Sequence, residues 1–227
     1  MAQITVGFLI YPGMVQLDMM SAHEVLAFPP DVTVHLVWKS LDAIATHEGL
    51  MLIPTTTIES CPPLDVMCVP GGTMGQLDVM RDGAILHFLQ HQAKSAQYVT
   101  SVCTGSMILA AAGLLQGYKA TCHWAFRDQL AMMGVDVVPQ RVVVDRNRVT
   151  GAGVTSGIDL GLLLLSFLYG ESMAKMAQLM MEYDPEPPFN AGSPDTAGPE
   201  VINPLMATAQ PLVDAFFTQT QETAGHC

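Results

Sequence analysis

The strongest constraint on the fold is a regular alternation between short, continuously apolar runs and longer helix-forming segments. The apolar runs are rich in β-branched residues and end in turn residues or a helical pattern, and they cover 4–10, 32–38, 65–69 and 98–102. Helix-forming segments lie between and after them, at 18–28, 76–94, 105–115 and 123–133. Runs without polar alternation are typical of strands buried on both faces. The pattern therefore predicts right-handed β-α-β units and an α/β fold with a doubly wound, mostly parallel sheet and helices on both faces.

The second half of the chain predicts a strand pair, a helix and a C-terminal extension. Residues 141–150 resemble a strand pair with a polar turn, and a very apolar helix follows at 157–169. The segment 184–204 is dense in Pro, Gly, Ser and Asp, which favours an excursion without regular structure. A last helix is expected at 205–219, where Pro211 should break or kink it.

Composition limits the number of domains and the class of partner. Half of the 227 residues are hydrophobic and 13% are charged, which is enough for a large core. We expect one domain over 1–227, with its core at about 4–170 and the excursion and helix at 184–220. The formal net charge is −12, and no Lys or Arg follows Lys175. Nucleic acid and anionic membrane surfaces are therefore poor partners, because both require clustered cations.

Cysteine usage and the first residues bear on location. The five cysteines are an odd number, widely spaced and without a C-x-x-C pair, which argues against a disulfide framework or a structural zinc site. Residues 1–4 lead into the strand pattern without a basic segment and cleavage site. The longest apolar run, around 160–169, is too short to span a bilayer. We therefore expect a cytoplasmic protein.

Cys103 lies at the junction between the apolar run 98–102 and the helix that follows it. Such a junction aims the side chain out of the carboxyl edge of the sheet and places it near the free amides and positive end of a helix. Both effects favour the thiolate, so Cys103 is a candidate nucleophile. The alternative is a small apolar residue packed beneath the helix, because free cysteines are often buried.

Two glycines follow another predicted strand at the same edge of the sheet. Gly71 and Gly72 come just after the run 65–69, and their backbone can approach a ligand closely. The amides of Gly72 and Thr104 could together stabilise a developing negative charge. Taken alone, a glycine turn required for chain reversal is the simpler explanation.

Asp18 follows the first predicted strand and its loop, and so can reach Cys103 at this edge. Taken alone, an ordinary helix N-cap explains it better. A carboxylate beside a thiolate raises both pKa values, so the two groups would share a proton. Glu24, on a different face of the same helix, is a weaker candidate.

Four other side chains have mainly structural interpretations. Thr155 and Ser156 could offer hydroxyls to a pocket, although capping of the helix 157–169 explains them better. His123 could activate a thiol, but nothing in the sequence fixes its distance from Cys103, and a structural histidine is the simpler interpretation. Cys122 is a fallback nucleophile.

Four motifs stand at 70–72 (Pro-Gly-Gly), 101–105 (Ser-Val-Cys-Thr-Gly), 112–117 (Ala-Gly-Leu-Leu-Gln-Gly) and 120–124 (Ala-Thr-Cys-His-Trp). Together they resemble the ThiJ/PfpI superfamily, which has a class I glutamine amidotransferase-like domain, over about 4–169. The resemblance implies a flavodoxin-like fold with the cysteine at a nucleophile elbow, and usually a homodimer. The segment 182–197 is also similar to the carboxyl-terminal segment of the isonitrile hydratase subgroup, which extends the match over nearly the whole chain.

The resemblance assigns roles to individual residues. Gln16-Leu17-Asp18 resembles the family's acidic position, so Cys103 is implied as the nucleophile and Asp18 as its acid/base partner. Because Thr104 follows the cysteine where the protease branch has a histidine, peptidase chemistry is disfavoured.

The activity implied by the resemblance is the addition of water to an organic isocyanide, giving an N-substituted formamide through a thioimidate on Cys103. No metal or redox cofactor is required. Thr104, Gly71, Gly72 and Thr155 would surround the small-molecule substrate. Two alternatives stay open: glyoxalase or deglycase-like chemistry on a reactive carbonyl, and a non-enzymatic redox-sensing or ligand-binding module that uses the same cysteine. A transcriptional regulator ranks lower, because the chain has neither the length nor the basic charge for an added helix-turn-helix region.

Overall fold

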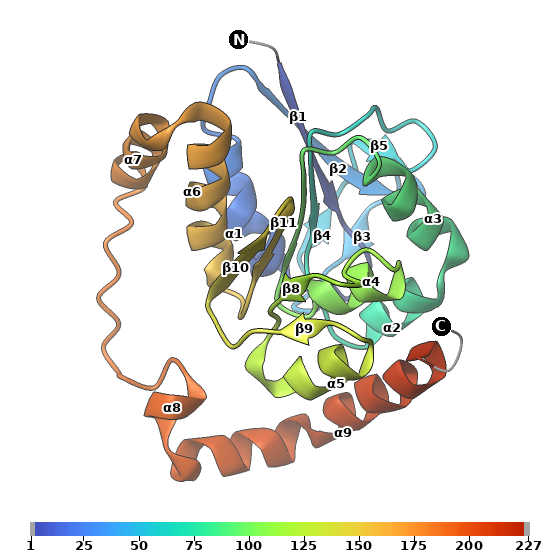
Figure 1. Cartoon of the computed structure of the whole chain (residues 1–227), viewed down its shortest axis with the longest axis vertical. Helices are drawn as coiled ribbons and strands as arrows, with labels where there is room; N and C mark the ends of the chain where they lie inside the picture. Colours follow the sequence, from blue (N-terminus) through green and yellow to red (C-terminus); the bar gives the residue numbers. More distant parts are fainter. Residues whose placement is uncertain (1–2, 225–227) are drawn as a thin grey trace.

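The computed structural model describes residues 3–224, and Cys227 lies outside the described residues. Seven strands form one sheet in the order β10-β11-β7-β6-β1-β2-β5 (Figure 1). These strands are β1 (Ile4–Leu9), β2 (Val32–Trp38), β5 (Thr56–Thr57), β6 (Val66–Val69), β7 (Tyr98–Val102), β10 (Val142–Asp145) and β11 (Arg148–Gly151). Neighbouring strands run parallel except in the antiparallel β10–β11 pair. The predicted doubly wound, mostly parallel sheet and the strand pair at 141–150 are therefore confirmed.

Helices cover both faces of the sheet. On one side in Figure 1 lie α1 (Gln16–Leu26), α6 (Ser156–Tyr169) and α7 (Glu171–Met180), and on the other α2 (Met74–Arg81), α3 (Gly83–Gln92) and α4 (Gly105–Ala111). A 3₁₀ turn at Trp124–Phe126 leads into α5 (Arg127–Met132). Two small two-stranded sheets complete this part, β3 (Ile44–Ala45) with β4 (Met51–Leu52), and β8 (Lys119–Ala120) with β9 (Asp136–Val137).

Two of the predicted helices are interrupted by a polar side chain. The single helix expected at 76–94 is instead α2 and α3, because Asp82 adopts an extended backbone and its Oδ1 accepts hydrogen bonds from the Ala84 and Ile85 amides. The helix expected at 123–133 begins later, because Nδ1 of His123 accepts from the amide of Ala125 and caps the 3₁₀ turn.

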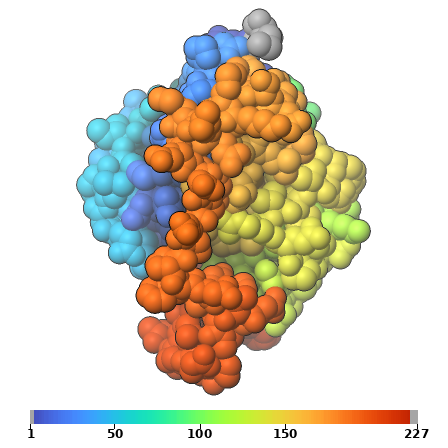
Figure 2. Space-filling view, turned by 90° about the vertical axis from the view of Figure 1, so that its left-hand side faces the viewer, coloured from blue at the N-terminus to red at the C-terminus, as the bar shows by residue number. Residues whose placement is uncertain are grey.

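The C-terminal segment is more helical than the sequence predicts. Residues 184–204 contain α8 (Pro194–Ala197) and the first turn of α9 (Pro199–Ala224), which continues through Pro211 without a break. Proline inside a helix costs about 3 kcal/mol, so packing must hold α9 together. The fully buried Phe216 supplies this packing, since its ring centre lies 4.9 Å from that of Phe126. Figure 2 shows residues 181–193, the strap between α7 and α8, crossing the surface of the molecule.

The centre of the sheet carries the core and positions the site. All four residues of β6 are buried, as are the last four of β7 and all of β11. The carboxyl ends of these parallel strands meet at one edge, where the loops to α2, α4 and α6 begin. Within residues 3–224, no helix is long and apolar enough to cross a membrane.

Candidate active site

Cys103 occupies a strained turn between β7 and α4. Its φ is +61°, a left-handed value that costs a residue other than glycine of order 1–3 kcal/mol unless its surroundings enforce it. Two features enforce it. The Cys103 amide donates to the Gly151 carbonyl at 3.1 Å, and Gly105 packs so closely on β6 that a Cβ there would lie 2.1 Å from the Val69 oxygen. The structure thus has the predicted strand-to-helix elbow at this cysteine.

Asp18 does not cap α1, as the sequence suggested it would. The helix begins at Gln16 with Val15 at the N-cap position, and no side chain caps it. The fully buried Asp18 side chain instead crosses to the neighbouring loop, where Oδ2 accepts a hydrogen bond from the Gly71 amide at 2.9 Å. The same carboxyl interacts with the Cys103 thiol. Glu24, on the other face of α1, is exposed.

The pair of Asp18 and Cys103 holds a proton at neutral pH. Burial raises the pKa of Asp18 from 3.8 to about 7, against the opposing effect of its hydrogen bonds with Cys103 and with the Gly71 amide. Burial is the largest of the effects that raise the pKa of Cys103 well above its usual range, and the negative charge of Asp18 raises it further. The Thr104 amide lowers the pKa of Cys103. Desolvation therefore outweighs the helix end that was expected to favour the thiolate. The thiol is protonated at rest, and its neighbour can accept the proton.

Gln76, at the third position of α2, ties the glycine loop to the elbow, and sequence reasoning missed it. Its side chain is fully buried. Oε1 accepts from the Gly72 amide at 2.8 Å and from the Thr104 hydroxyl at 2.6 Å, and Nε2 donates to the Thr104 carbonyl at 2.8 Å. The one available signal was a glutamine four residues after Gly72, which is too common a spacing to single out.

These contacts occupy hydrogen-bonding groups that the sequence analysis placed around the substrate. The Gly71 amide is bonded to Asp18, and the Gly72 amide and Thr104 hydroxyl are bonded to Gln76. The Thr104 amide faces the sulfur of Cys103. Gly71 has no room for a side chain, because a Cβ would lie 2.5 Å from the Thr104 hydroxyl and 2.7 Å from Asp18 Oδ2. The two glycines therefore fix the position of the Asp18 carboxyl relative to the turn at Cys103.

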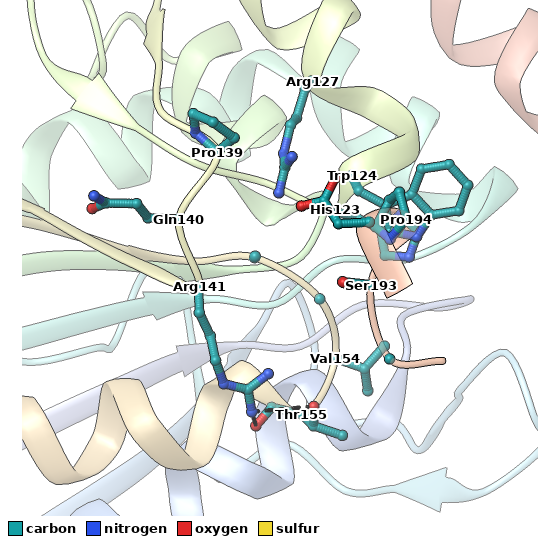
Figure 3. A pocket seen from close by; sticks show the side chains of 14 residues that line it. His123, Trp124, Arg127, Pro139, Gln140, Arg141, Val154, Thr155, Ser193 and Pro194 are labelled. Carbon is teal, nitrogen blue, oxygen red and sulfur yellow. Dashed lines mark hydrogen bonds between the residues drawn. The ribbon is translucent and has the colours of Figure 1, made fainter. Parts of the chain in front are cut away.

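A cavity of about 590 Å³ lies beside this centre (Figure 3). Its lining comes from the segment after β8, the loop before β10, the loop after β11 and the start of α8, and consists of His123, Trp124, Arg127, Pro139, Gln140, Arg141, Ala152, Gly153, Val154, Thr155, Gly192, Ser193, Pro194 and Asp195. Cys103 and Asp18 are not part of this wall. The nearest link between the two is Gly151, the last residue of β11, whose carbonyl accepts from the Cys103 amide and which is followed in the chain by Ala152 of the cavity wall.

The other candidate residues make contacts that do not involve the thiol of Cys103 in a hydrogen bond. Thr155 is at the N-cap of α6 but makes no capping bond, contrary to expectation; instead its hydroxyl and carbonyl accept from Arg141 at 3.3 and 3.0 Å. His123 lines the cavity and caps the 3₁₀ turn. Burial raises the pKa of Cys122 to about 12, and its thiol donates to the His123 carbonyl at 3.4 Å. Because Cys103 has the Asp18 carboxyl to take its proton, Cys122 is the poorer nucleophile at neutral pH. Within residues 3–224 no group of three His, Cys, Asp or Glu side chains could hold a metal.

The parallel sheet, the strained cysteine elbow and the buried carboxyl define an α/β protein of the nucleophile-elbow class. The chain belongs to the DJ-1/PfpI family, whose model matches residues 4–166. A protein named isonitrile hydratase from Pseudomonas putida is 51% identical over 208 residues, which cover 92% of this chain and 91% of that protein. The HTH-type transcriptional regulator GbdR of Pseudomonas aeruginosa is 30% identical over 79% of this chain, but the match covers only 51% of the regulator.

Solved structures agree with this assignment. A ThiJ/PfpI family protein from Pseudomonas syringae superposes with a TM-score of 0.94 at 43% identity, covering 97% of this chain and 91% of that one. Drosophila melanogaster DJ-1beta superposes with a TM-score of 0.74 at 19% identity, over 80% of this chain and 98% of that one. The latter likeness concerns the fold alone.

Proposed function

We propose that this protein is an isonitrile hydratase, which adds water to an organic isocyanide R–N≡C and yields the formamide R–NH–CHO. The observation that carries the proposal is the buried pair of Cys103 and Asp18, which shares a proton at a strained elbow. It occurs in a chain that is 51% identical, over 92% of its length, to a protein with that name. An electrophilic carbon with no leaving group requires a nucleophile and a proton delivered together, and this pair supplies both.

The first step is addition of the thiol across the terminal carbon. Asp18 takes the proton of Cys103 while the sulfur bonds to the isocyanide carbon, and the proton is then delivered to that carbon. The product is the thioimidate R–N=CH–S–Cys103. Its formation replaces direct attack by neutral water with two easier steps. The Thr104 amide, which faces the sulfur, is placed to orient the intermediate.

The second step is hydrolysis of the thioimidate. Asp18, again ionised, removes one proton from a water molecule as its oxygen bonds to the carbon, and this proton passes to the substrate nitrogen. The tetrahedral adduct then collapses, the carbon–sulfur bond breaks, and the hydroxyl proton returns to the thiolate through Asp18. One water is consumed per isocyanide, and the pair regains its resting protonation. Gly71 and Gln76 keep the carboxyl and the elbow in place throughout.

We further propose that the chain forms a homodimer as a single domain in the cytoplasm, and that the second subunit covers part of the substrate pocket. Three large apolar side chains support this: Leu179 and Met180 on α7 are 82% and 77% exposed, and Phe189 in the strap is 79% exposed. Large apolar side chains exposed to this degree are typical of an interaction site. Thr155 and the strap would then lie near the substrate entrance.

A direct assay tests the activity. Purified protein is incubated with phenyl isocyanide or with methylglyoxal, and products are followed by NMR. The proposal predicts N-phenylformamide and its loss in Cys103→Ala. Conversion of methylglyoxal alone would overturn the proposal in favour of reactive-carbonyl chemistry. A redox-sensing role is disfavoured by the raised pKa of the thiol, because peroxide reacts with the thiolate.

A further inference from the structure

The cavity contains an arginine that has no hydrogen-bond or ion-pair partner for its side chain among residues 3–224. Arg127, the first residue of α5, points into the space between Pro139 and His123 (Figure 3). Its Nε is buried and makes no hydrogen bond, and none of the ion pairs found in residues 3–224 involves its guanidinium. This is unusual in a chain with 21 acidic and nine basic residues, where carboxylates are plentiful. A buried donor without an acceptor is costly to leave unpaired, so the position suggests a missing anion.

The other charges at the cavity do not fill this role. Arg141 is already neutralised, because its Nε pairs with Asp159 at 2.6 Å. Asp195 and Asp128 are exposed, so water screens both carboxylates. Burial, and then the charge of Arg127, lower the pKa of His123, which keeps that ring neutral at neutral pH. One uncompensated positive charge therefore faces the cavity.

The cavity also leads toward the nucleophile. Ala152, which lines it, follows Gly151, and the Gly151 carbonyl accepts from the Cys103 amide at 3.1 Å. This part of the wall therefore adjoins the strand residue that is bonded to the backbone of the elbow. The lining also includes the apolar side chains of Trp124, Val154 and Pro194. A ligand that reacts at Cys103 could thus extend an apolar body along the cavity and place a charged end at Arg127.

We infer that Arg127 binds a carboxylate on the substrate, so that the substrate class is isocyanides bearing a carboxylate. The inference rests on the proposed function for the reacting end of the molecule. A carboxylate fits better than a phosphate, because the planar guanidinium matches it in a bidentate fashion and a single free cation cannot balance a dianion in a protein of net charge −12. Arg127 is then a specificity residue that takes no part in the chemical steps.

The test compares 4-isocyanobenzoate with its methyl ester, which differ in one charge. Wild-type protein is expected to hydrate the carboxylate with a kcat/KM about 10-fold or more above that of the ester, the range of a charge-assisted hydrogen bond. In Arg127→Gln this ratio should fall toward one through a higher KM for the carboxylate, and Arg127→Lys should restore part of it. The matched control is Arg146→Gln, which removes the same charge at the far end of β11.

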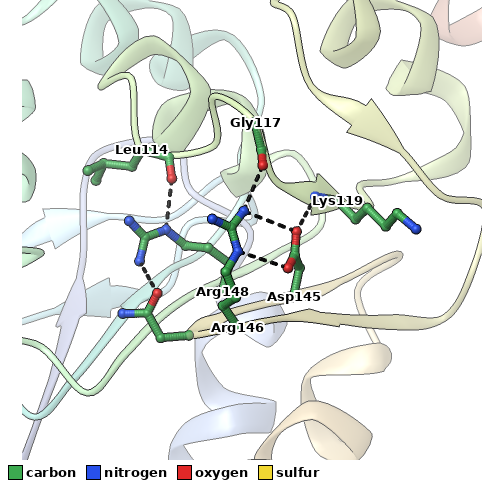
Figure 4. Close-up of polar contacts among 7 residues, drawn as sticks. Leu114, Gly117, Lys119, Asp145, Arg146 and Arg148 are labelled. Atoms are coloured by element: carbon green, nitrogen blue, oxygen red, sulfur yellow. Dashed lines mark hydrogen bonds and ion pairs between the residues drawn. The ribbon is translucent and has the colours of Figure 1, made fainter.

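Figure 4 shows the guanidinium of Arg146 held by Asp145 and by the Gly117 carbonyl. Arg146 is a suitable control because it is not among the residues that line the cavity. The control variant should keep the wild-type ratio. A second readout needs no turnover: 4-formamidobenzoate, the product, should bind Cys103→Ala in a calorimeter about 10-fold or more tighter than its methyl ester does.

The outcomes are separable. Turnover of both isocyanides without a preference for the carboxylate in wild type, or an equal preference in Arg127→Gln, would overturn this inference and leave the proposed function standing. Turnover of neither isocyanide by protein with native circular dichroism would overturn the proposed function, and with it the substrate class.

Discussion

Replacing Asp18 with asparagine should make the protein more stable and much less active. The carboxyl is fully buried, which raises its pKa from 3.8 to about 7. Between these two values the folded protein retains a proton that the unfolded chain has released, so this group lowers stability as the pH rises from about 4 to about 7. One pKa unit is worth about 1.36 kcal/mol, so the ionisable carboxyl costs about 4.3 kcal/mol at pH 8 and about 1.7 kcal/mol at pH 5.

Asparagine carries no charge at either pH, and its side-chain oxygen can still accept from the Gly71 amide. The stability gained by Asp18→Asn, measured as the increase in its free energy of unfolding over wild type, should therefore be about 2.6 kcal/mol larger at pH 8 than at pH 5. Urea unfolding followed by circular dichroism at one protein concentration measures this difference. Asp78→Asn, which changes an exposed carboxyl, is the control and should show no comparable dependence on pH. A gain of the same size at both pH values, or a loss of stability at pH 8, would refute the reasoning.

Three further results are expected. First, kcat/KM for isocyanide hydration should rise with pH through an apparent pKa of about 7, because Asp18 must be ionised to accept the thiol proton. This rise with pH should be absent in Asp18→Asn, and a wild-type kcat/KM that stays constant between pH 5 and 8 argues against the shared proton. Second, Gln76→Leu leaves the Gly72 amide and the Thr104 carbonyl unpaired, so urea unfolding should show a free energy of unfolding about 2–4 kcal/mol lower than in wild type. The variant should also have a lower kcat, and unchanged values of both quantities would contradict a positioning role for Gln76. Third, Gly71→Ala should lower the hydration rate at least about 100-fold by displacing Asp18. The control Gly83→Ala, whose Cβ meets nothing within 4 Å, should keep the wild-type rate, and equal rates in the two variants would contradict the role of packing at Gly71.

The fold was predictable where the signal was local or periodic. The strands over 32–38 and 98–102 have the expected bounds, because a continuously apolar run leaves few alternatives to a buried strand. The elbow at Cys103 was predictable for the same reason, since it lies between two strong patterns. The sequence misled at 76–94, where Asp82 redirects the backbone with its own side chain. It also misled where it allowed a break at Pro211, because packing of Phe216 keeps α9 continuous there.

The reacting groups of the site could be predicted from the sequence, but the residues that hold them in place could not. Asp18 lies in the first turn of α1, where an acidic side chain usually interacts with its own helix, and only the three-dimensional structure shows it bonded to Gly71. Gln76 and Arg127 gave no signal, because their roles depend on groups brought together by the sheet from segments far apart in the chain.

The central claim is that the sulfur of Cys103 adds to the isocyanide carbon, and intact-mass spectrometry under single-turnover conditions tests it most directly. Enzyme in excess is mixed with phenyl isocyanide and quenched in acid at successive times. We expect a transient mass increase equal to the whole isocyanide, because addition releases nothing. The adduct should lie on the peptide that contains Cys103, and its decay should match the appearance of N-phenylformamide. Formation of the formamide by Cys103→Ala at the wild-type rate, or an adduct on Cys122 in its place, would contradict it.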